Sequence, residues 1–579
     1  MKDIHLILKE HWGYHAFRPQ QEAIINAVLQ QKDCLALLPT GGGKSLCFQV
    51  PALARQGLCL VISPLIALMK DQVEALRKKN ITAFFIHAGL PRKEVINTLI
   101  LAGRSNCKFL YVSPERLQSN LFKEYLHSLG ISLIAVDEAH CISQWGYDFR
   151  PSYLKIAALR EELPGVPVIA LTASATKEVQ HDICKKLLFN DHEIFRQSFA
   201  RPNLSYSVFN VPSGNAKVLD ILSKVNGSGI VYCRNRNRTR EVSDLLNRNG
   251  ISADYYHAGL QPEERSSKQE AWLKNNTRVI VCTNAFGLGI DKPQVRVVIH
   301  ADTPDCLENY YQEAGRSGRD GKRSYAVLLY NDKEISKLQA SSTVRFPELS
   351  RIRKIYQALM NHLQIPAGAG EGQYYELDIT NFISQFDLPS QEVMAVLKTL
   401  EQEQLLCFND QVFIPSRLQV IADRESLSGF EKYHPLSGPL IKSLMRNYEG
   451  ILDHPVNIYE KAIARMLKTD PGNVSKELRE LQAHGIVEYS LQREKPVIYL
   501  LQNRVKADDL QVNIVEYKKR KNQYESQVAA MVNFVTSPVL CRSVTIGNYF
   551  GDQSIQPCGI CDVCLNSKRT GMSIDLKLG

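Results

Sequence analysis

Short runs of apolar and β-branched residues recur along the first 345 residues and alternate with longer amphipathic stretches. The first series of runs covers residues 34–38, 58–63, 109–113, 133–137 and 168–172, and the second covers residues 229–233, 277–283, 295–301 and 325–330. Strands that alternate with helices predict a parallel sheet with helices on both faces. Because the series is interrupted near residues 198–203, we expect two α/β domains of this kind, at residues 1–200 and 201–345.

The pattern changes after residue 345 to helices that are each followed by two short alternating strands. The two sets are residues 392–404, 405–408 and 411–415, and then residues 474–483, 485–489 and 496–501. A helix followed by a two-stranded wing is typical of winged-helix modules. We therefore expect two winged-helix-like α+β modules, at residues 346–436 and 437–505. Small α+β domains without DNA contact are the alternative.

Composition and charge add only broad limits. Hydrophobic residues make up 44% and charged residues 22% of the 579 residues, as in ordinary globular proteins, and the net charge of +10 suits a polyanionic partner without requiring one. Residues 1–10 are charged and amphipathic, and the apolar stretch 57–69 is short and broken by Pro64. We expect no secretory signal, no membrane association and a cytoplasmic protein, associated with the nucleoid if it is bacterial.

A phosphate-binding loop follows the first predicted strand. Residues 39–45 read Pro39-Thr40-Gly41-Gly42-Gly43-Lys44-Ser45 and precede an amphipathic helix. The glycines let successive N–H groups point at phosphate oxygens, Lys44 supplies charge to the β- and γ-phosphates, and the Ser45 hydroxyl can bind Mg²⁺. Leu38 stands where the strict pattern has glycine. The expected ATP-binding residues are Thr40, Gly41, Gly42, Gly43, Lys44 and Ser45.

Two carboxylates follow another buried run. Residues 133–136 are apolar, and Asp137-Glu138-Ala139-His140 comes directly after them. Asp137 can hold Mg²⁺, and Glu138 can orient and deprotonate the attacking water. By itself such a pair would usually be a solvated turn, but together with the phosphate loop it predicts nucleotide hydrolysis.

Hydrolysis also needs positive charge for the transition state. The segment Gln312-Glu313-Ala314-Gly315-Arg316-Ser317-Gly318-Arg319 offers two arginines in the second α/β domain. Arginines delivered across a domain cleft couple hydrolysis to closure. We expect Arg316 and Arg319 to be catalytic.

With these motifs, residues 1–345 resemble superfamily 2 helicases, and further segments resemble the RecQ family. Phe17-Arg18-Pro19-Gln20-Gln21 is similar to the adenine-recognition motif of that family, which implies that Gln21 reads the base; the family usually has glycine where this chain has Gln20. Other family-like segments occur in the family's order at residues 63–72, 113–116, 171–176, 256–259 and 283–292. The resemblance implies that their threonine and serine turns grip a nucleic-acid backbone and that Asp291 helps to couple the two domains.

An aromatic-rich segment continues from the carboxylates. Residues 137–151 resemble the RecQ loop that senses single-stranded DNA and couples it to hydrolysis. Trp145, Tyr147 and Phe149 would offer stacking faces, each worth roughly 1–3 kcal/mol per base, and Arg150 would contact phosphate. Aromatics packed in a core are the alternative, which the interleaved polar residues disfavour.

Four of the 14 cysteines form the pattern C-x16-C-x2-C-x2-C at Cys541, Cys558, Cys561 and Cys564. Four thiolates that converge from a turn and a helix predict a closed structural Zn²⁺ site rather than surface thiols or a redox pair. Residues 506–566 resemble the RecQ zinc-binding subdomain, and residues 567–579 read as a polar tail. In the family this subdomain directly follows the motor, whereas here residues 346–505 intervene, which implies rearranged accessory domains and leaves the strand-splitting wing unassigned.

These observations lead to one main hypothesis and two alternatives. The resemblance implies an ATP- and Mg²⁺-dependent DNA helicase that moves 3′ to 5′ on single-stranded DNA and unwinds duplex DNA, with recombination or repair proteins as partners. One alternative is a DEAH-type RNA helicase, because Asp137–His140 is shared. The other is a winged-helix DNA-binding protein with a degenerate motor, which the intact Lys44, Asp137, Glu138 and Arg319 disfavour.

Overall fold

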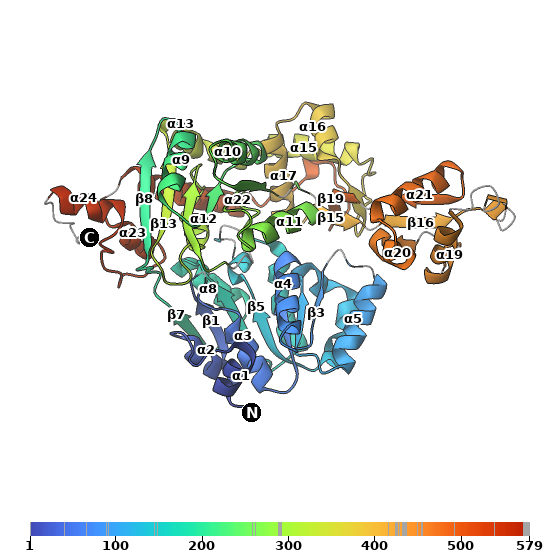
Figure 1. Cartoon of the computed structure of the whole chain (residues 1–579), viewed down its shortest axis with the longest axis horizontal. Helices are drawn as coiled ribbons and strands as arrows, with labels where there is room; N and C mark the ends of the chain where they lie inside the picture. The colour runs from blue at the N-terminus through green and yellow to red at the C-terminus, as the bar shows by residue number, and fades with distance from the viewer. Residues whose placement is uncertain are drawn as a thin grey trace. The chain divides into compact units, whose positions relative to one another are not determined.

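The computed structural model describes residues 2–570, except for residues 40, 65, 88–89, 91, 144, 147–148, 258, 261, 288–291, 415, 423–425, 428, 431–436, 449, 453–455, 491–492 and 538 (Figure 1). The chain forms two compact units. The first joins Met1–Phe346 to Val512–Gly579, and the second consists of Pro347–Gln511. The second unit is therefore an insertion in the sequence of the first.

The first α/β domain contains a parallel sheet in which seven strands of the described chain run in the order β3-β4-β2-β5-β6-β1-β7. The strands are β1 (Asp33–Leu37), β2 (Leu58–Ile62), β3 (Ala83–Ile86), β4 (Phe109–Val112), β5 (Ile131–Val136), β6 (Val168–Thr172) and β7 (His192–Arg196). The helices are α1 (Ile4–Trp12), α2 (Gln21–Leu29), α3 (Leu46–Ala54), α4 (Ile66–Arg77), α5 (Arg92–Arg104), α6 (Asn120–Leu126), α7 (Leu159–Glu162) and α8 (Lys177–Lys186).

The sheet is parallel and covered on both faces because its strands are apolar on both sides. In β2, Leu58, Leu60 and Ile62 enter one core, whereas Cys59 and Val61 enter another on the opposite face. Helices α5, α6 and α8 contribute to the first core, and α2, α3 and α4 contribute to the second. This arrangement confirms the parallel fold expected from the continuous apolar runs.

The second α/β domain repeats this architecture. Among the described residues, six parallel strands run in the order β10-β11-β9-β12-β13-β8. They are β8 (Leu204–Asn210), β9 (Ser228–Tyr232), β10 (Ala253–Tyr256), β11 (Val279–Cys282), β12 (Val295–His300) and β13 (Ser324–Tyr330). The helices are α9 (Gly214–Lys224), α10 (Arg236–Arg248), α11 (Pro262–Leu273), α12 (Leu307–Ala314), α13 (Asp332–Gln339) and α14 (Ser341–Arg345).

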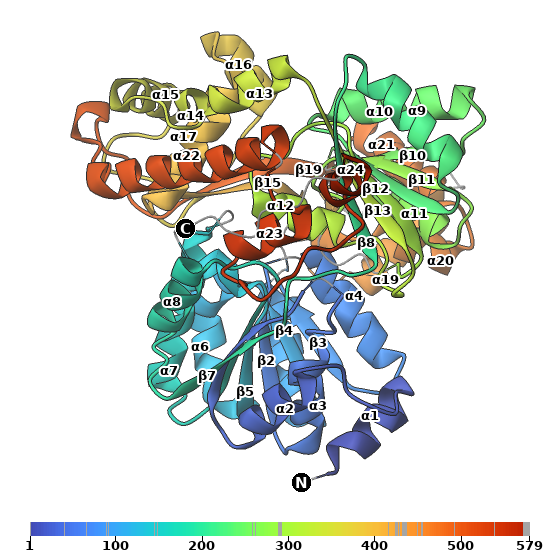
Figure 2. The same ribbon diagram turned by 90° about the vertical axis from the view of Figure 1, so that its left-hand side faces the viewer.

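The C-terminal helices complete this second domain. They are α22 (Ile514–Thr536), α23 (Arg542–Tyr549) and α24 (Asp562–Thr570). Tyr206 of β8 and Tyr310 of α12 share one apolar core with Phe534 of α22 and Phe550, which follows α23. Figure 2 shows α23 and α24 beside β8, although more than 300 residues separate them in the sequence. The C-terminal segment is therefore last in the chain but packs directly on the second sheet.

The second unit holds two antiparallel modules. The first has helices α15 (Leu349–His362), α16 (Ile379–Phe386) and α17 (Ser390–Gln402), and strands β14 (Tyr374–Glu376), β15 (Leu406–Ile414) and β19 (Arg493–Leu500). The other has helices α19 (Gly438–Asn447), α20 (Glu460–Leu467) and α21 (Pro471–Ala483), and strands β16 (Ser416–Val420), β17 (Val456–Ile458) and β18 (Val487–Ser490). Both modules have the helix and strand content expected of winged helices.

The strand pairing corrects the expected boundary between these modules. β19 pairs with β14 and β15, whereas β16 pairs with β17 and β18. The first module is thus residues 347–414 together with 493–511, and residues 416–490 form a module nested inside it. The nesting is possible because Ile414 lies opposite Arg493, so the inserted module leaves and returns at one end of a hairpin. The expected division at residues 436 and 437 cuts through this nested module.

Each helix in the described part of the chain is too short or too polar to cross a bilayer.

Candidate nucleotide site and zinc-binding module

The phosphate loop leaves the carboxyl end of β1 and enters α3. Gly41 and Gly43 have φ angles of 82° and 78°, in the left-handed region that favours glycine. A Cβ on Gly43 would lie 2.4 Å from Nε2 of Gln21, and a Cβ on Gly42 would lie 2.9 Å from the carbonyl oxygen of Pro39. All three glycines are therefore required by the local geometry. Thr40, the remaining expected residue of the loop, lies outside the described residues.

Gln21 is held against this loop. The residue is 1% exposed, and Nε2 donates to the carbonyl oxygens of Gly42 and Gly43, each at 3.1 Å. Its Oε1 accepts from the backbone N–H of Arg18 at 2.9 Å. The preceding Gln20 has φ 69°, a left-handed conformation that explains why glycine is the usual residue there in the family that this segment resembles.

A cavity of about 470 Å³ borders the loop and Gln21. Its lining includes Trp12, Tyr14, Arg18, Ser45 and Lys79. Its size and its aromatic lining suit a nucleoside. Sequence reasoning did not assign Trp12 and Tyr14 to the site. The sequence feature that could have indicated them is the presence of two aromatic residues shortly before the motif that contains Gln21.

The two carboxylates lie at the same edge of the sheet, after β5. The backbone N–H of Glu138 donates to Oδ1 of Asp137 at 3.0 Å, and Glu138 itself has φ 47°. Burial and the adjacent Glu138 carboxylate raise the pKa of Asp137, while the Lys44 ammonium opposes that rise. Lys44 is therefore near enough to Asp137 for their charges to interact, as a shared metal–phosphate site requires.

Glu138 belongs to a chain of polar contacts that reaches the second domain. Its Oε2 lies 3.3 Å from Nδ1 of His140, and the same nitrogen lies 3.0 Å from Oγ1 of Thr172 at the end of β6. The backbone N–H of Ser174 donates to that oxygen at 3.4 Å. Finally, Nε2 of Gln312, on α12, donates to Oγ of Ser174 at 2.9 Å.

The two arginines of the predicted site have different surroundings. Arg319 reaches the phosphate loop, because a Cβ on Gly41 would lie 3.0 Å from its Cγ. Arg316 is 6% exposed and stays inside the second domain, where its positive charge acts on the Tyr232 hydroxyl. The structure therefore places the Arg319 side chain against the nucleotide loop of the first domain, whereas the Arg316 side chain lies beside Tyr232 of the second.

The aromatic segment after Glu138 is only partly exposed. Phe149 is 6% exposed and packs in the core, so it offers no stacking face in this structure. Trp145 is half-buried against the core that contains Cys141 and Ile142, and Nη1 of Arg150 donates to the carbonyl oxygen of Pro64 at 3.2 Å. Tyr147, like Asp291 of the second domain, lies outside the described residues.

The four cysteines of the C-terminal segment converge. The sulfurs of Cys541, Cys558, Cys561 and Cys564 all lie within 4.8 Å of one another. Sγ of Cys541 is 3.5 Å from that of Cys558 and 3.8 Å from that of Cys561. A tetrahedral ion with Zn–S bonds of about 2.3 Å needs sulfurs roughly 3.8 Å apart, so this donor set fits Zn²⁺. Arg542 and Asp562, each next to a cysteine ligand, form an ion pair at 3.0 Å that joins α23 to α24.

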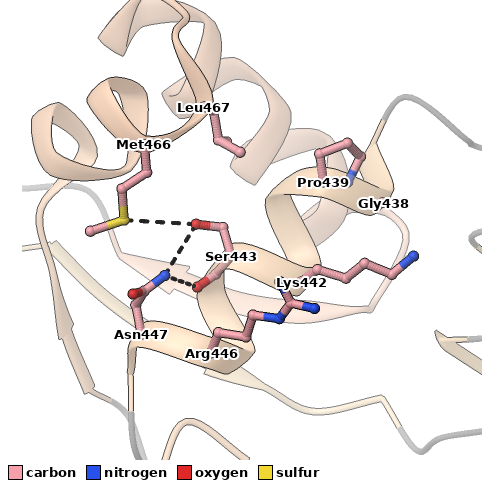
Figure 3. A pocket seen from close by; sticks show the side chains of 8 residues that line it. All are labelled: Gly438, Pro439, Lys442, Ser443, Arg446, Asn447, Met466 and Leu467. Atoms are coloured by element: carbon pink, nitrogen blue, oxygen red, sulfur yellow. Dashed lines mark hydrogen bonds between the residues drawn. The ribbon is translucent and has the colours of Figure 1, made fainter.

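A second cavity, of about 690 Å³, lies between α19 and α20 of the nested module (Figure 3). Met466, Ser443 and Asn447 point toward one another there, whereas the Lys442 side chain extends away from them. Nδ2 of Asn447 donates to the backbone oxygen of Ser443 at 2.7 Å. Sequence reasoning named none of these residues, because polar residues four positions apart on an amphipathic helix look like any solvated face.

Comparison with known families assigns the four parts of the chain. Residues 18–182 match the model of the DEAD/DEAH box helicase, and residues 214–321 match the helicase conserved C-terminal domain. Residues 418–491 match the RecQ helicase winged-helix domain of Bacteroidota, which coincides with the nested module. Residues 500–565 match the RecQ zinc-binding model, so the converging cysteines form a zinc-binding site of the RecQ type.

Known relatives match the motor part of the chain. The ATP-dependent DNA helicase RecQ of Haemophilus influenzae is 42% identical over 336 residues, which cover 58% of this chain and 54% of that protein. RecQ of Bacillus subtilis is 43% identical over 332 residues, covering 57% and 56%. The chain thus spans little more than half the length of these relatives. The probable ATP-dependent DNA helicase RecS of Bacillus subtilis is 42% identical over 334 residues, covering 57% of this chain and 67% of that protein. These matches and the two RecQ-specific models show that the chain belongs to the RecQ helicase family.

Proposed function

We propose that the protein is an ATP-dependent DNA helicase that translocates 3′ to 5′ on single-stranded DNA and unwinds duplex DNA. The observation that carries the proposal is the approach of Arg319, from the second α/β domain, to the phosphate loop of the first. Relatives that match both domains are named ATP-dependent DNA helicases. A role in DNA recombination and repair, in the cytoplasm or on the nucleoid, is part of the same proposal.

The residues at the edge of the first sheet support a mechanism for hydrolysis. Lys44 and the N–H groups of the glycine loop bind the β- and γ-phosphates, and the cavity beside Tyr14 receives the nucleoside. Ser45 and Asp137 would hold Mg²⁺, which neutralises phosphate charge, because hydroxyl and carboxylate oxygens are its preferred ligands. Glu138 accepts the proton of the attacking water.

Charge on the transferred phosphoryl group is stabilised from the second domain. Arg319 supplies the guanidinium, since it is the arginine of the second domain whose side chain approaches Gly41 of the loop. Arg316 has a positioning role: its interaction with the Tyr232 hydroxyl holds the segment that carries Arg319. The 2.9 Å bond between Gln312 and Ser174 closes the two domains together and links that closure to Glu138 through Thr172 and His140.

DNA binds along the carboxyl edges of the two sheets. Arg236 and Arg240 are exposed at and after the start of α10, which follows β9, and their guanidinium groups favour phosphate. On the first domain, Trp145 offers part of a ring for stacking next to the catalytic carboxylates. Phe149 supports this loop from inside, and Arg150 fixes it to Pro64. Binding of the strand therefore moves residues adjacent to Glu138, which couples DNA to hydrolysis.

A comparison of nucleic acids tests the proposal. We expect single-stranded DNA to stimulate ATP hydrolysis and RNA not to, and Lys44→Ala to reduce both hydrolysis and strand separation about a hundredfold or more. The control is Lys185→Ala, which removes an exposed lysine of α8 from the same domain and should leave both activities unchanged. Stimulation by RNA alone would support a DEAH-type RNA helicase instead. Unwinding by Lys44→Ala at the wild-type rate would contradict the assigned site.

A further inference from the structure

The helix that leads to the two arginines is held by the zinc-binding module. Helix α12 ends at Ala314, and Arg316 and Arg319 follow it directly. Oε1 of Glu308, in its first turn, accepts hydrogen bonds from Nε2 of Gln527 at 3.0 Å and from the Tyr549 hydroxyl at 2.8 Å. Both donors belong to the zinc-binding module.

Glu308 is buried, at 3% exposed, and its carboxylate depends on these two donors. Burial raises the pKa of Glu308, and the hydrogen bonds from Tyr549 and Gln527 oppose that rise. A buried carboxylate that loses a donor keeps its desolvation penalty without compensation. Glu308 therefore has a strong preference for the one position in which both donors reach it.

Aromatic residues next to Glu308 form further contacts between α12 and the zinc-binding module. The ring of Tyr310 lies 5.3 Å from that of Phe534, and the ring of Tyr311 lies 5.4 Å from that of Phe550, measured between centroids. Three successive parts of the helix thus contact α22, α23 or the residue after α23. The helix cannot shift without disturbing the zinc-binding module.

The module also holds the segment that ties down the arginine loop. Asp552 accepts from the Ser198 hydroxyl at 2.8 Å and from the backbone N–H of Phe199 at 3.2 Å. Arg201, three residues after Ser198, donates from Nη1 to the oxygen of Gly315 at 3.2 Å and from Nη2 to that of Ser317 at 2.9 Å. The linker between the two α/β domains therefore connects the zinc-binding module to the backbone around Arg316.

We infer that the zinc-binding module fixes the position of Arg319 for ATP hydrolysis, with Glu308 as the positioning residue that receives its hold. This inference rests on the proposed hydrolysis of ATP. Displacement of a catalytic group by about 1 Å lowers a rate about a hundredfold. If the first turn of α12 loses its hydrogen bonds to the zinc-binding module, we therefore expect the rate of ATP hydrolysis to fall while the protein remains folded. The zinc-binding module then positions a catalytic group as well as stabilising the fold.

The test removes the two donors and leaves the buried carboxylate. In Gln527→Leu/Tyr549→Phe we expect kcat for ATP hydrolysis to fall about tenfold or more, with KM for ATP within about twofold. Affinity for ADP with aluminium fluoride, which mimics the transition state, should fall while affinity for ADP stays constant. Zinc content should remain one ion per chain. A merely structural role would not separate the two nucleotide affinities.

The matched control is Tyr524→Phe. It removes another buried tyrosine hydroxyl from α22, one that forms its hydrogen bond with Ser341, at 2.8 Å, rather than with Glu308. Equal kcat in the double variant and in this control would overturn the inference. If the double variant loses zinc or unfolds, Tyr549→Phe alone is read in the same way, and Glu308→Gln, which keeps an acceptor oxygen, should retain most of the wild-type kcat. Loss of kcat in Glu308→Gln equal to that in Glu308→Leu would also contradict the inference. Hydrolysis that persists in Lys44→Ala would instead count against the proposed function itself.

Discussion

The two α/β domains and the inserted unit differ in whether the order of their strands must be known before neighbouring residues can be identified. In the parallel sheets, every carboxyl end lies at one edge, so Lys44 after β1 and Glu138 after β5 meet although β6 separates their strands. In the inserted unit, the partner of a strand decides the module to which it belongs, as for β19. Parallel domains can thus reveal their chemistry before their strand order is known, whereas antiparallel ones cannot.

The zinc-binding module shows a third relation between sequence and space. Its position at the end of the chain implied rearranged accessory domains. Its core is shared with β8 and α12, so the module follows the motor directly in space and residues 347–511 are an insertion between the two. The order of domains along the chain is therefore no guide to which of them act together.

Removal of zinc should have the largest effect and should separate the two kinds of region. Structural zinc contributes roughly 10–16 kcal/mol of apparent binding free energy in small domains. Because Tyr310 and Tyr311 lose their partners without the module, we expect chelation to destabilise β8 and β13 of the second sheet as well. Residues 416–490, whose core lies within Leu418–Tyr489, should keep their protection in hydrogen exchange.

Cys407→Ser is the control for this experiment, because Cys407 lies outside the zinc cluster. That variant should retain zinc and the exchange pattern of the wild type. Chelation that exposes only α22–α24, with the second sheet as protected as before, would show that the module is an independent appendage.

Two deletions should sharpen the nesting of the inserted unit. Replacing residues 415–492 with Asn-Gly joins Ile414 to Arg493 through a two-residue turn and should leave the first module and ATP hydrolysis intact. Deleting residues 437–505 instead removes β19, with its buried Val497, Ile498 and Leu500. Burial of such side chains contributes about 1.5–3 kcal/mol each, so the second deletion should unfold the first module.

Urea unfolding and limited proteolysis of residues 347–414 distinguish the two outcomes. Equal protease sensitivity of both deletions would contradict the assignment of β19 to the first module.

The same contrast explains what could be predicted from the sequence. The run 34–38 predicted the position of β1 within one residue, because a short apolar run between the polar Lys32-Asp33 and the turn-forming Pro39 has few other interpretations. The run 496–501 also gave a strand, but its alternating pattern fits β15 and β18 equally well as partners. Only the fold shows that the 78 residues between β15 and β19 contain the sheet and helices of the nested module, from β16 to β18.

Side-chain environment was the harder part of the site to predict. The polar neighbours of Phe149 predicted an exposed ring. In the structure, the Arg150 guanidinium donates a hydrogen bond to the carbonyl oxygen of Pro64, and Phe149 is buried. The two arginines of residues 316 and 319 looked equivalent in the sequence. Their difference arises from Gly41, which belongs to another domain and comes close to only one of them.

The smallest predicted effect concerns local backbone geometry in the motor, where the sequence departs from the family. Gln20 has φ 69° and ψ −21° before α2, a conformation that costs a residue with a side chain about 1–2 kcal/mol. Glycine removes that strain but loses roughly 0.5–1 kcal/mol through the entropy of the unfolded chain. We therefore expect Gln20→Gly to stabilise the protein by about 0.5–1 kcal/mol, seen as a higher urea midpoint at an unchanged slope. The control is Gln30→Gly at the other end of α2, where φ is −77° and glycine brings only the entropic loss. If both variants destabilise the protein equally, the left-handed backbone at Gln20 carries no strain, and the absence of glycine there has no energetic consequence.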